Sequence, residues 1–212
     1  MGIAGMATLV VFVLAASTLV TSNQYPTEQT AKMAFNLPVD FTKVRRILMR
    51  TEATKAITNL AGDSKFLDEK WERITPAIDL SSGLVPSLNL ELRAKLKVQS
   101  LDDYIGRPIV HLNQVVSITG DEIDSNIKLA EPTERLLQYH LVTRYVPGED
   151  PSETRVEMRL TQEILTTAPW FAHRIADNRV YASAEATLEH QAEAIRQLIS
   201  ENQDKSGFWP IP

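Results

Sequence analysis

The four histidines are the first residues to test for chemistry: His111, His140, His173 and His190. His111 and His140 fall on the polar side of alternating segments, opposite the apolar residues, so they do not converge on one another. No histidine pair has the spacing of a zinc-binding helix. The chain has no cysteine, which excludes thiolate metal sites, disulfides and a cysteine nucleophile. We therefore expect surface histidines and no metal site.

Nucleophile and phosphate motifs are also absent: the chain has no GxSxG, no P-loop and no GxGxxG. Glu157 and Glu163 alternate outward, and Asp102 and Asp103 sit where a strand ends. An enzyme of the cyclase or dehydratase type would need a positioned acid and base, and the sequence names no such pair. We predict no catalytic residue and no cofactor.

Polar residues on apolar faces are more informative. Gln114, Gln162 and Thr143 each fall in register with apolar neighbours. A buried polar group without a partner costs roughly 1–3 kcal/mol, so each needs one. The partner is either another core group or water, or else the polar end of an apolar ligand in a cavity. Tyr139, Tyr145 and Trp71 fit the same two interpretations. These six residues are the predicted ligand-binding candidates.

Those candidates lie on a regular series of elements. Thr30–Leu37 alternates apolar and polar residues as a strand does, and two short helices are expected at Asp40–Arg50 and Glu52–Leu60. Six more segments alternate in the same way: Ser64–Ile74, Leu88–Leu101, Pro108–Thr119, Glu122–Leu129, Arg135–Val146 and Thr154–Leu165. Trp170–Asn202 then has helical periodicity and no glycine or proline.

The order β-α-α-β6-α predicts an α+β fold. A curved antiparallel sheet of about seven strands has one apolar face, and the long last helix is the element large enough to cover it. A bent sheet that grips one helix leaves room for an apolar cavity between them.

This order resembles the START-like superfamily, also called the helix-grip, polyketide cyclase/dehydrase-like or SRPBCC fold. The resemblance rests on the opening MAFNLPVDFTKVRRIL, the antiparallel run from Ser64 to Leu165, and the last helix from PWFAHRIADNRVYASAEATLEHQAEAIRQLI. It implies binding or transfer of a lipid, quinone or similar apolar molecule, and a minority of members are enzymes. The loop Pro76–Pro86 and the apolar N-terminus depart from the usual pattern.

That N-terminus reads as a membrane-directed segment. No residue from Met1 to Pro26 is charged, and Ile3–Val20 is long enough, at about 27 Å as a helix, to cross a hydrocarbon core of about 30 Å. The segment is either a single-pass anchor or a signal peptide cleaved before Asn23, in which case the protein is exported. A buried core helix fits least, because nothing in it is amphipathic.

The predicted organisation is therefore a membrane or signal segment at 1–22, a tether at 23–29, a START-like domain at 30–202 and a tail at 203–212. The formal net charge of −5 excludes a nucleic-acid partner of the usual basic kind. We expect the membrane and an apolar small molecule as partners. The alternative is a non-catalytic accessory subunit of a larger membrane complex, which the apolar tail Phe208–Pro212 favours.

Overall fold

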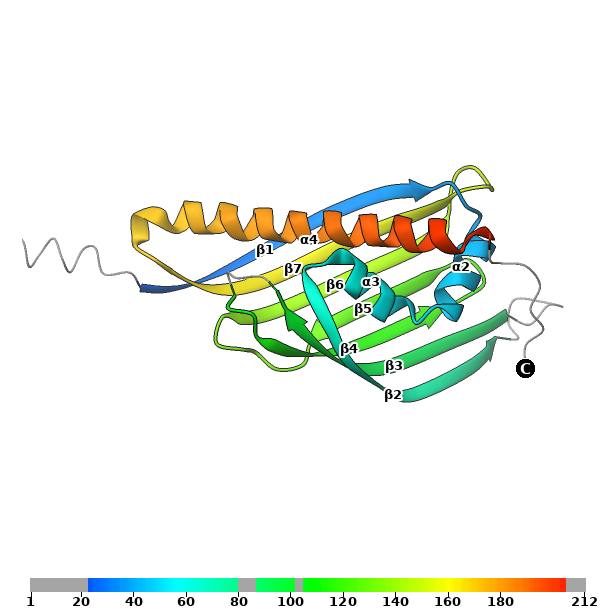
Figure 1. Ribbon diagram of the computed structural model, residues 1–212, viewed down its shortest axis with the longest axis horizontal. Helices are drawn as coiled ribbons and strands as arrows, with labels where there is room; N and C mark the ends of the chain where they lie inside the picture. Colours follow the sequence, from blue (N-terminus) through cyan, green and yellow to red (C-terminus); the bar gives the residue numbers. More distant parts are fainter. Residues whose placement is uncertain (1–22, 80–86, 102–104, 205–212) are drawn as a thin grey trace, which may run out of the picture.

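A computed structural model describes residues 23–79, 87–101 and 105–204 of the chain. The chain order is β1 Asn23–Leu37, α2 Phe41–Arg50, α3 Ala53–Ala61, β2 Ser64–Asp79, β3 Ser87–Ser100, β4 Ile109–Ile118, β5 Ile123–Leu129, β6 Leu136–Pro147, β7 Thr154–Ala168, the short 3₁₀ helix η1 Trp170–Ala172, and α4 His173–Asn202. The predicted helix-grip architecture is confirmed: seven strands form one curved antiparallel sheet, and the long helix α4 lies along it (Figure 1).

The strands stand in the order β1-β7-β6-β5-β4-β3-β2, so the first two strands of the chain form the two edges of the sheet. Strands β2 to β7 follow one another as neighbours, as short connections favour. β1 instead pairs with the last strand, from Asn23 opposite Ala168 to Leu37 opposite Thr154. The two helices between β1 and β2 carry the chain from one edge to the other.

Helix α4 buries one stripe of small and branched residues against the sheet. Val180, Ala184 and Leu188 are fully buried one turn apart. The stripe continues through Ala192, Ile195 and Ile199. Because three or four residues separate its members, the stripe stays on one side of the helix for its whole length. This side contacts β1, β7 and α3, which places the helix over one half of the sheet.

The two short helices have clear boundaries. The Asp40 side chain accepts a hydrogen bond of 2.9 Å from the backbone N–H of Lys43, which caps the start of α2. Helix α3 ends at Gly62, whose φ of 75° is a left-handed conformation that glycine adopts without strain. Both helices were predicted within a residue or two of these bounds.

The predicted tether at 23–29 is wrong, because those residues belong to β1 and pair with β7 residues 162–168. Thr27 is buried here, and Pro26 is tolerated because β1 is an edge strand. Strand β2 likewise extends to Asp79, past the predicted end at Ile74, so Pro76 lies in a strand and not in a loop. The sequence did not predict either strand extension, because both contain polar residues and proline, which interrupt the expected alternation.

The predicted segment at 1–22, and most of the predicted tail at 203–212, lie outside the described residues. No helix within the part of the chain that the structure describes combines the length and the apolar character needed to cross a membrane.

Replacing Leu160 tests the packing between sheet and helix. Leu160 lies on β7 and is fully buried. Leu160→Ala should lower the free energy of unfolding by about 2–5 kcal/mol, because the cavity it leaves cannot collapse fully. The matched control is Arg159→Ala, next on the strand and exposed, which should change it by about 0.5 kcal/mol or less. Urea unfolding followed by circular dichroism measures both, and equal values for the two variants would contradict this packing.

Candidate functional site

A cavity of about 320 Å³ lies between α4 and the sheet. Its sheet wall is apolar and includes Val98, Val110, Leu112, Leu136 and Ile164. Its helix wall is mostly polar and small: Ser183, Ala186, Thr187, His190 and Gln191. The remaining wall includes residues 62–64, where α3 passes into β2, and Ser100 and Leu101 at the end of β3. The cavity therefore has a mixed lining, with apolar strands facing a polar strip of helix.

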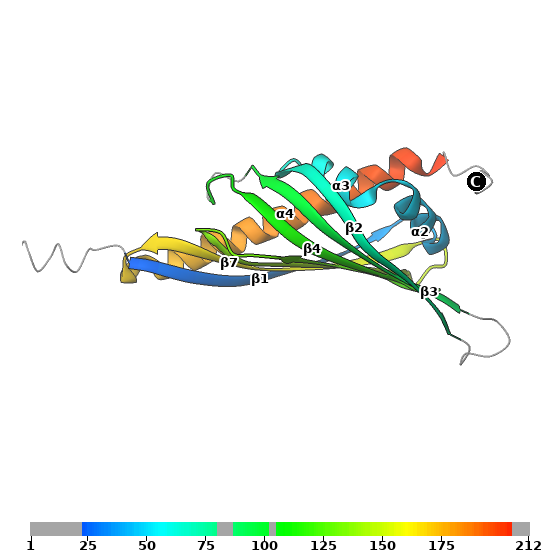
Figure 2. The same ribbon diagram turned by 90° about the horizontal axis from the view of Figure 1, so that it is seen from below.

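The bend of the sheet explains why space remains here. Helix α4 contacts β1 and β7, whereas β2, β3 and β4 run at an oblique angle to these two strands (Figure 2). Helix α3 covers part of the opening, since it contacts both α4 and β2. A straight helix cannot stay in contact with every strand of a sheet that bends this strongly, so a gap opens beyond β7.

A smaller cavity of about 90 Å³ adjoins the first. The two share wall residues Ser64, Val98, Leu112, Tyr139 and Gln191. The smaller one extends towards Thr54, Ile57 and Thr58 of α3 and towards Gln114 and Ser125 of the sheet. Together they form a main chamber with a polar inner recess.

Gln114 anchors the inner recess. The hydroxyl of Thr54 lies 2.9 Å from its amide nitrogen and 3.1 Å from its amide oxygen, and the amide nitrogen also donates to the hydroxyl of Ser125 at 3.2 Å. The amide is thus satisfied by core groups from α3 and β5, yet it also lines the recess. Thr143 and Tyr145 line the same recess and are buried.

Gln162 lies in the wall of the main chamber. Its amide nitrogen donates a hydrogen bond of 3.0 Å to the backbone carbonyl of Val180, which ties β7 to α4 at this point. Tyr139 stands opposite Gln162 across the β6–β7 ladder and lines both cavities. Five of the six predicted candidates thus lie in the walls of adjoining cavities. Their role in binding stays a prediction.

Trp71 is the exception, because it is 46% exposed on the edge strand β2 and is not part of either cavity wall. Two register shifts, between Phe66 and Asp68 and between Trp71 and Arg73, break the alternation of β2. Trp71 pairs with the buried Ala94, but it lies at the sheet edge, where little covers it. The predicted placement of Trp71 in the pocket is therefore wrong.

A similar irregularity moves the start of β6. The alternation of Arg135–Val146 predicts Leu137 on the apolar face together with Tyr139, but the register shifts between Leu136 and Gln138, so Leu136 is the residue that is buried and lines the main chamber. From Tyr139 onward the predicted alternation holds.

Glu69 is partly buried, and the sequence did not predict this because the register shifts of β2 break the alternation around it. It pairs with the buried Leu96, and one of its carboxylate oxygens is buried without a hydrogen-bond partner among the described residues. Burial raises the pKa of Glu69 above its ordinary value, against the lowering effect of a hydrogen bond from Trp71. Glu69 lies outside the walls of both cavities, so it is not assigned to the site.

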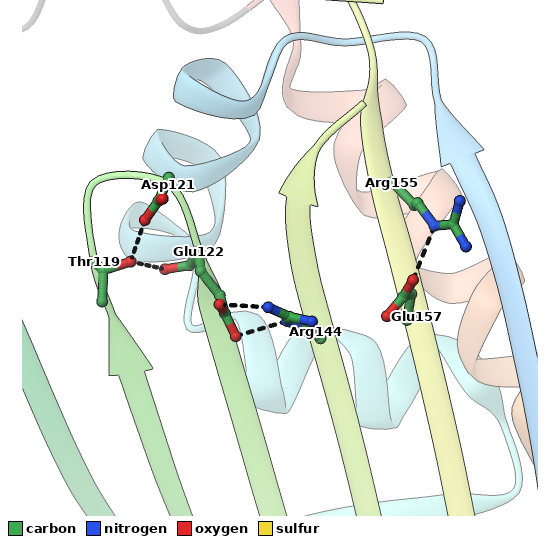
Figure 3. Close-up of polar contacts among 6 residues, drawn as sticks. All are labelled: Thr119, Asp121, Glu122, Arg144, Arg155 and Glu157. Atoms are coloured by element: carbon green, nitrogen blue, oxygen red, sulfur yellow. Dashed lines mark hydrogen bonds and ion pairs between the residues drawn. The ribbon is translucent and has the colours of Figure 1, made fainter. Parts of the chain in front are cut away.

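The opposite face of the sheet carries charge pairs. Arg144 of β6 binds both carboxylate oxygens of Glu122 at 2.7 Å, and Arg155 of β7 pairs with Glu157 at 2.9 Å (Figure 3). The predicted outer position of His140 fits this face, where it hydrogen-bonds to Asn126 at 3.0 Å. Burial, followed by Lys128 and Arg159, lowers the pKa of His140. These pairs are half exposed and keep the face hydrated.

The sequence did not predict that residues of α4 form one wall of the main chamber. Ser183, Thr187 and Gln191 recur every four residues, beside the buried stripe Ala184–Leu188–Ala192. A line of small polar residues along the border of an apolar stripe indicates a helix that faces a cavity instead of a packed core. His190, expected on the surface, is exposed and also lines the chamber.

No family model matches the chain. No curated protein matches it either. Among solved structures, a START superfamily protein from Mycobacterium smegmatis is 16% identical, with 81% of this chain and 97% of that chain covered and a TM-score of 0.48. The Zhui aromatase/cyclase from Streptomyces sp. R1128 is 9% identical, with 84% and 94% covered and a TM-score of 0.43. The fold description therefore stands on the strand order and helix of this chain itself.

The two cavity tyrosines should make stability depend on alkaline pH. Burial raises the pKa of Tyr139 and Tyr145 above the ordinary 10.0, with a smaller contribution from Asp63 at Tyr139. The folded protein then holds protons that the unfolded chain releases, so stability is complete below about pH 10 and falls as the pH rises above it.

Urea unfolding at about pH 8 and about pH 11 measures this effect, which should be smaller in the double variant Tyr139→Phe/Tyr145→Phe. Tyr181→Phe, at a partly exposed position, is the matched control and should behave as wild type. An unchanged alkaline loss in the double variant would contradict burial of these hydroxyls.

Proposed function

We propose that this chain binds an apolar small molecule in the cavity between α4 and the sheet. The observation that supports this most is the cavity itself: about 320 Å³, with an adjoining recess of about 90 Å³. Ligand sites in proteins have volumes of roughly 300–1,000 Å³, mostly apolar walls and a few polar groups that orient the ligand. The two cavities together are at the small end of that range.

The lining restricts the chemistry of the ligand. Apart from Asp63 and His190, the wall residues of both cavities are uncharged at physiological pH, including Tyr139 and Tyr145, whose pKa burial raises still further above the ordinary 10.0. An ion placed deep in such a site would lose hydration without a compensating charge. A neutral ligand with an apolar body and one or two hydroxyl, carbonyl or similar groups fits the recess, where Gln114 and Thr143 provide hydrogen-bonding atoms.

The proposal includes attachment to a membrane through Ile3–Val20. This stretch is apolar enough and long enough to span a bilayer, and only Thr21 and Ser22 separate it from Asn23, where β1 begins. A domain held this close to lipid would have direct access to apolar molecules dissolved in it. The cavity and the membrane attachment together support binding or transfer of a lipid, a quinone or a similar molecule.

Filling the chamber tests ligand binding. Ala186 is an exposed position on α4 that lines the chamber, so Ala186→Trp should place an indole ring in it and reduce the bound ligand several-fold. Ser200→Trp, exposed on the same helix outside the cavity walls, is the matched control and should retain wild-type binding. The measurement is mass spectrometry of an organic extract of full-length protein purified in mild detergent, as moles of compound per mole of protein.

Lipid that adheres to the N-terminal segment is present in both variants, so the difference between them reports the cavity alone. An extract of wild type that contains no more compound than Ala186→Trp would refute the binding proposal and would favour the accessory-subunit alternative.

The attachment has its own test, since an anchor and a cleaved signal leave different N-termini. We expect the mature protein to keep Ile3–Val20 and to resist extraction from membranes by alkaline carbonate. N-terminal sequencing decides the matter: a mature chain that starts at Asn23 would show an exported protein without an anchor.

A further inference from the structure

We propose that an exposed aromatic patch at the start of α4 inserts into the headgroup layer of a lipid bilayer and fixes the orientation of the domain on the membrane. The patch consists of Trp170, Phe171 and Ile175. This inference rests on the proposed attachment through Ile3–Val20 and adds a second, separate contact with the same bilayer.

The exposure of the patch is unusual for such large apolar side chains. Trp170 is 70% exposed, Phe171 60% and Ile175 56%. The rings of Trp170 and Phe171 meet edge to face, with centroids 5.9 Å apart, so they form one continuous apolar surface. Further along α4 the exposed side is acidic, with Glu185, Glu189 and Glu193. The apolar surface is therefore confined to the first turns of the helix.

Chain connectivity places this patch beside the proposed anchor. Asn23, the first residue of β1, pairs with Ala168, and Trp170 follows Ala168 by two residues. Thr21 and Ser22 separate Asn23 from the apolar segment that ends at Val20. Three residue steps extend about 11 Å at most, and two steps about 7 Å. Val20 and Trp170 therefore stay close to each other, because the β1–β7 pairing holds Asn23 beside Ala168.

The short reach between the proposed anchor and the patch identifies the lipid bilayer as the partner of the patch. The polar layer on each side of a bilayer is roughly 5–8 Å thick, which is half the difference between a total of about 40–45 Å and a core of about 30 Å. An anchor that crosses the core therefore holds Asn23 within about 11 Å of the core edge, in or next to that layer, and the β1–β7 pairing keeps Trp170 and Phe171 close to Asn23. Tryptophan is enriched at this depth, because its ring is apolar and its N–H remains hydrated.

The patch is also held firmly. Tyr25 of β1 stacks on His173 of α4 with centroids 3.7 Å apart and planes 2° apart. The backbone N–H of Ala172 donates to the carbonyl of Pro169 at 2.8 Å, which closes the turn that carries Trp170 and Phe171. The strand that leaves the proposed anchor thus contacts α4, which carries Ile175 and directly follows Trp170 and Phe171 of η1. Arg174 and Arg179, both exposed nearby, suit lipid phosphates at the same surface.

The contact would position the ligand cavity close to lipid. Ser183, the first wall residue on α4, follows Ile175 by eight residue positions, which is about 12 Å along a helix. An apolar molecule passing between the bilayer and the cavity would then cross a short path along one side of α4.

Quenching of tryptophan fluorescence by brominated lipid tests the contact directly. The full-length chain carries three tryptophans, Trp71, Trp170 and Trp209. The variant Trp71→Phe/Trp209→Phe keeps only Trp170 and is reconstituted in vesicles of phosphatidylcholine and phosphatidylglycerol. Phosphatidylcholine brominated near the headgroup end of its chains should reduce this fluorescence several-fold more than phosphatidylcholine brominated near the methyl end.

The matched control is Trp170→Phe/Trp209→Phe, which keeps the exposed Trp71 on the edge strand β2. It should show no quenching with either lipid. Flotation of the vesicles reports the attachment separately. Protein that floats while Trp170 remains unquenched would overturn the aromatic contact and leave the anchor standing. Protein that fails to float would overturn the attachment, and this inference with it.

Discussion

The packing of α4 against one half of the bent sheet is the interaction on which the other features depend. Its buried stripe runs from Ala176 to Ile199 and has small residues at Ala176, Ala184 and Ala192. Small side chains allow the helix axis to approach the strands closely, and β1 and β7 lie beneath it. Because the sheet is curved and α4 makes its close contacts with β1 and β7, space remains between the helix and the other strands, and the cavity forms there.

The polar groups of the cavity follow from the same geometry. The backbone of α4 lies closest to β1 and β7, so the apolar faces of β3, β4 and β6 are packed less closely by this helix, and α3 covers part of the space that remains. Gln114 binds Thr54 of α3 and so joins that helix to the sheet. Gln162 binds the carbonyl of Val180 and joins α4 to the sheet. Each amide therefore supports one side of the cavity and also lines it.

Strand alternation predicted most of this architecture, because a sheet with one hydrated face imposes a two-residue period on every strand. Gln114 and Gln162 were placed correctly in this way. The errors occurred where the period breaks: bulges in β2 and β6 displaced Trp71 and Leu137, and polar residues concealed the first seven residues of β1. The helix wall escaped prediction, since Ser183 and Thr187 resemble an ordinary hydrated helix until the bend of the sheet is known.

The place of β1 in the sheet connects the two proposed properties of the protein. β1 is an edge strand, and its partner β7 leads directly into η1 and α4. The start of β1 and the start of α4 are therefore neighbours, although about 150 residues separate them in the chain. α4 also forms one wall of the cavity. The start of β1, where the proposed anchor would attach, therefore lies next to the helix that forms one wall of the cavity, and a bilayer at that end would lie close to both.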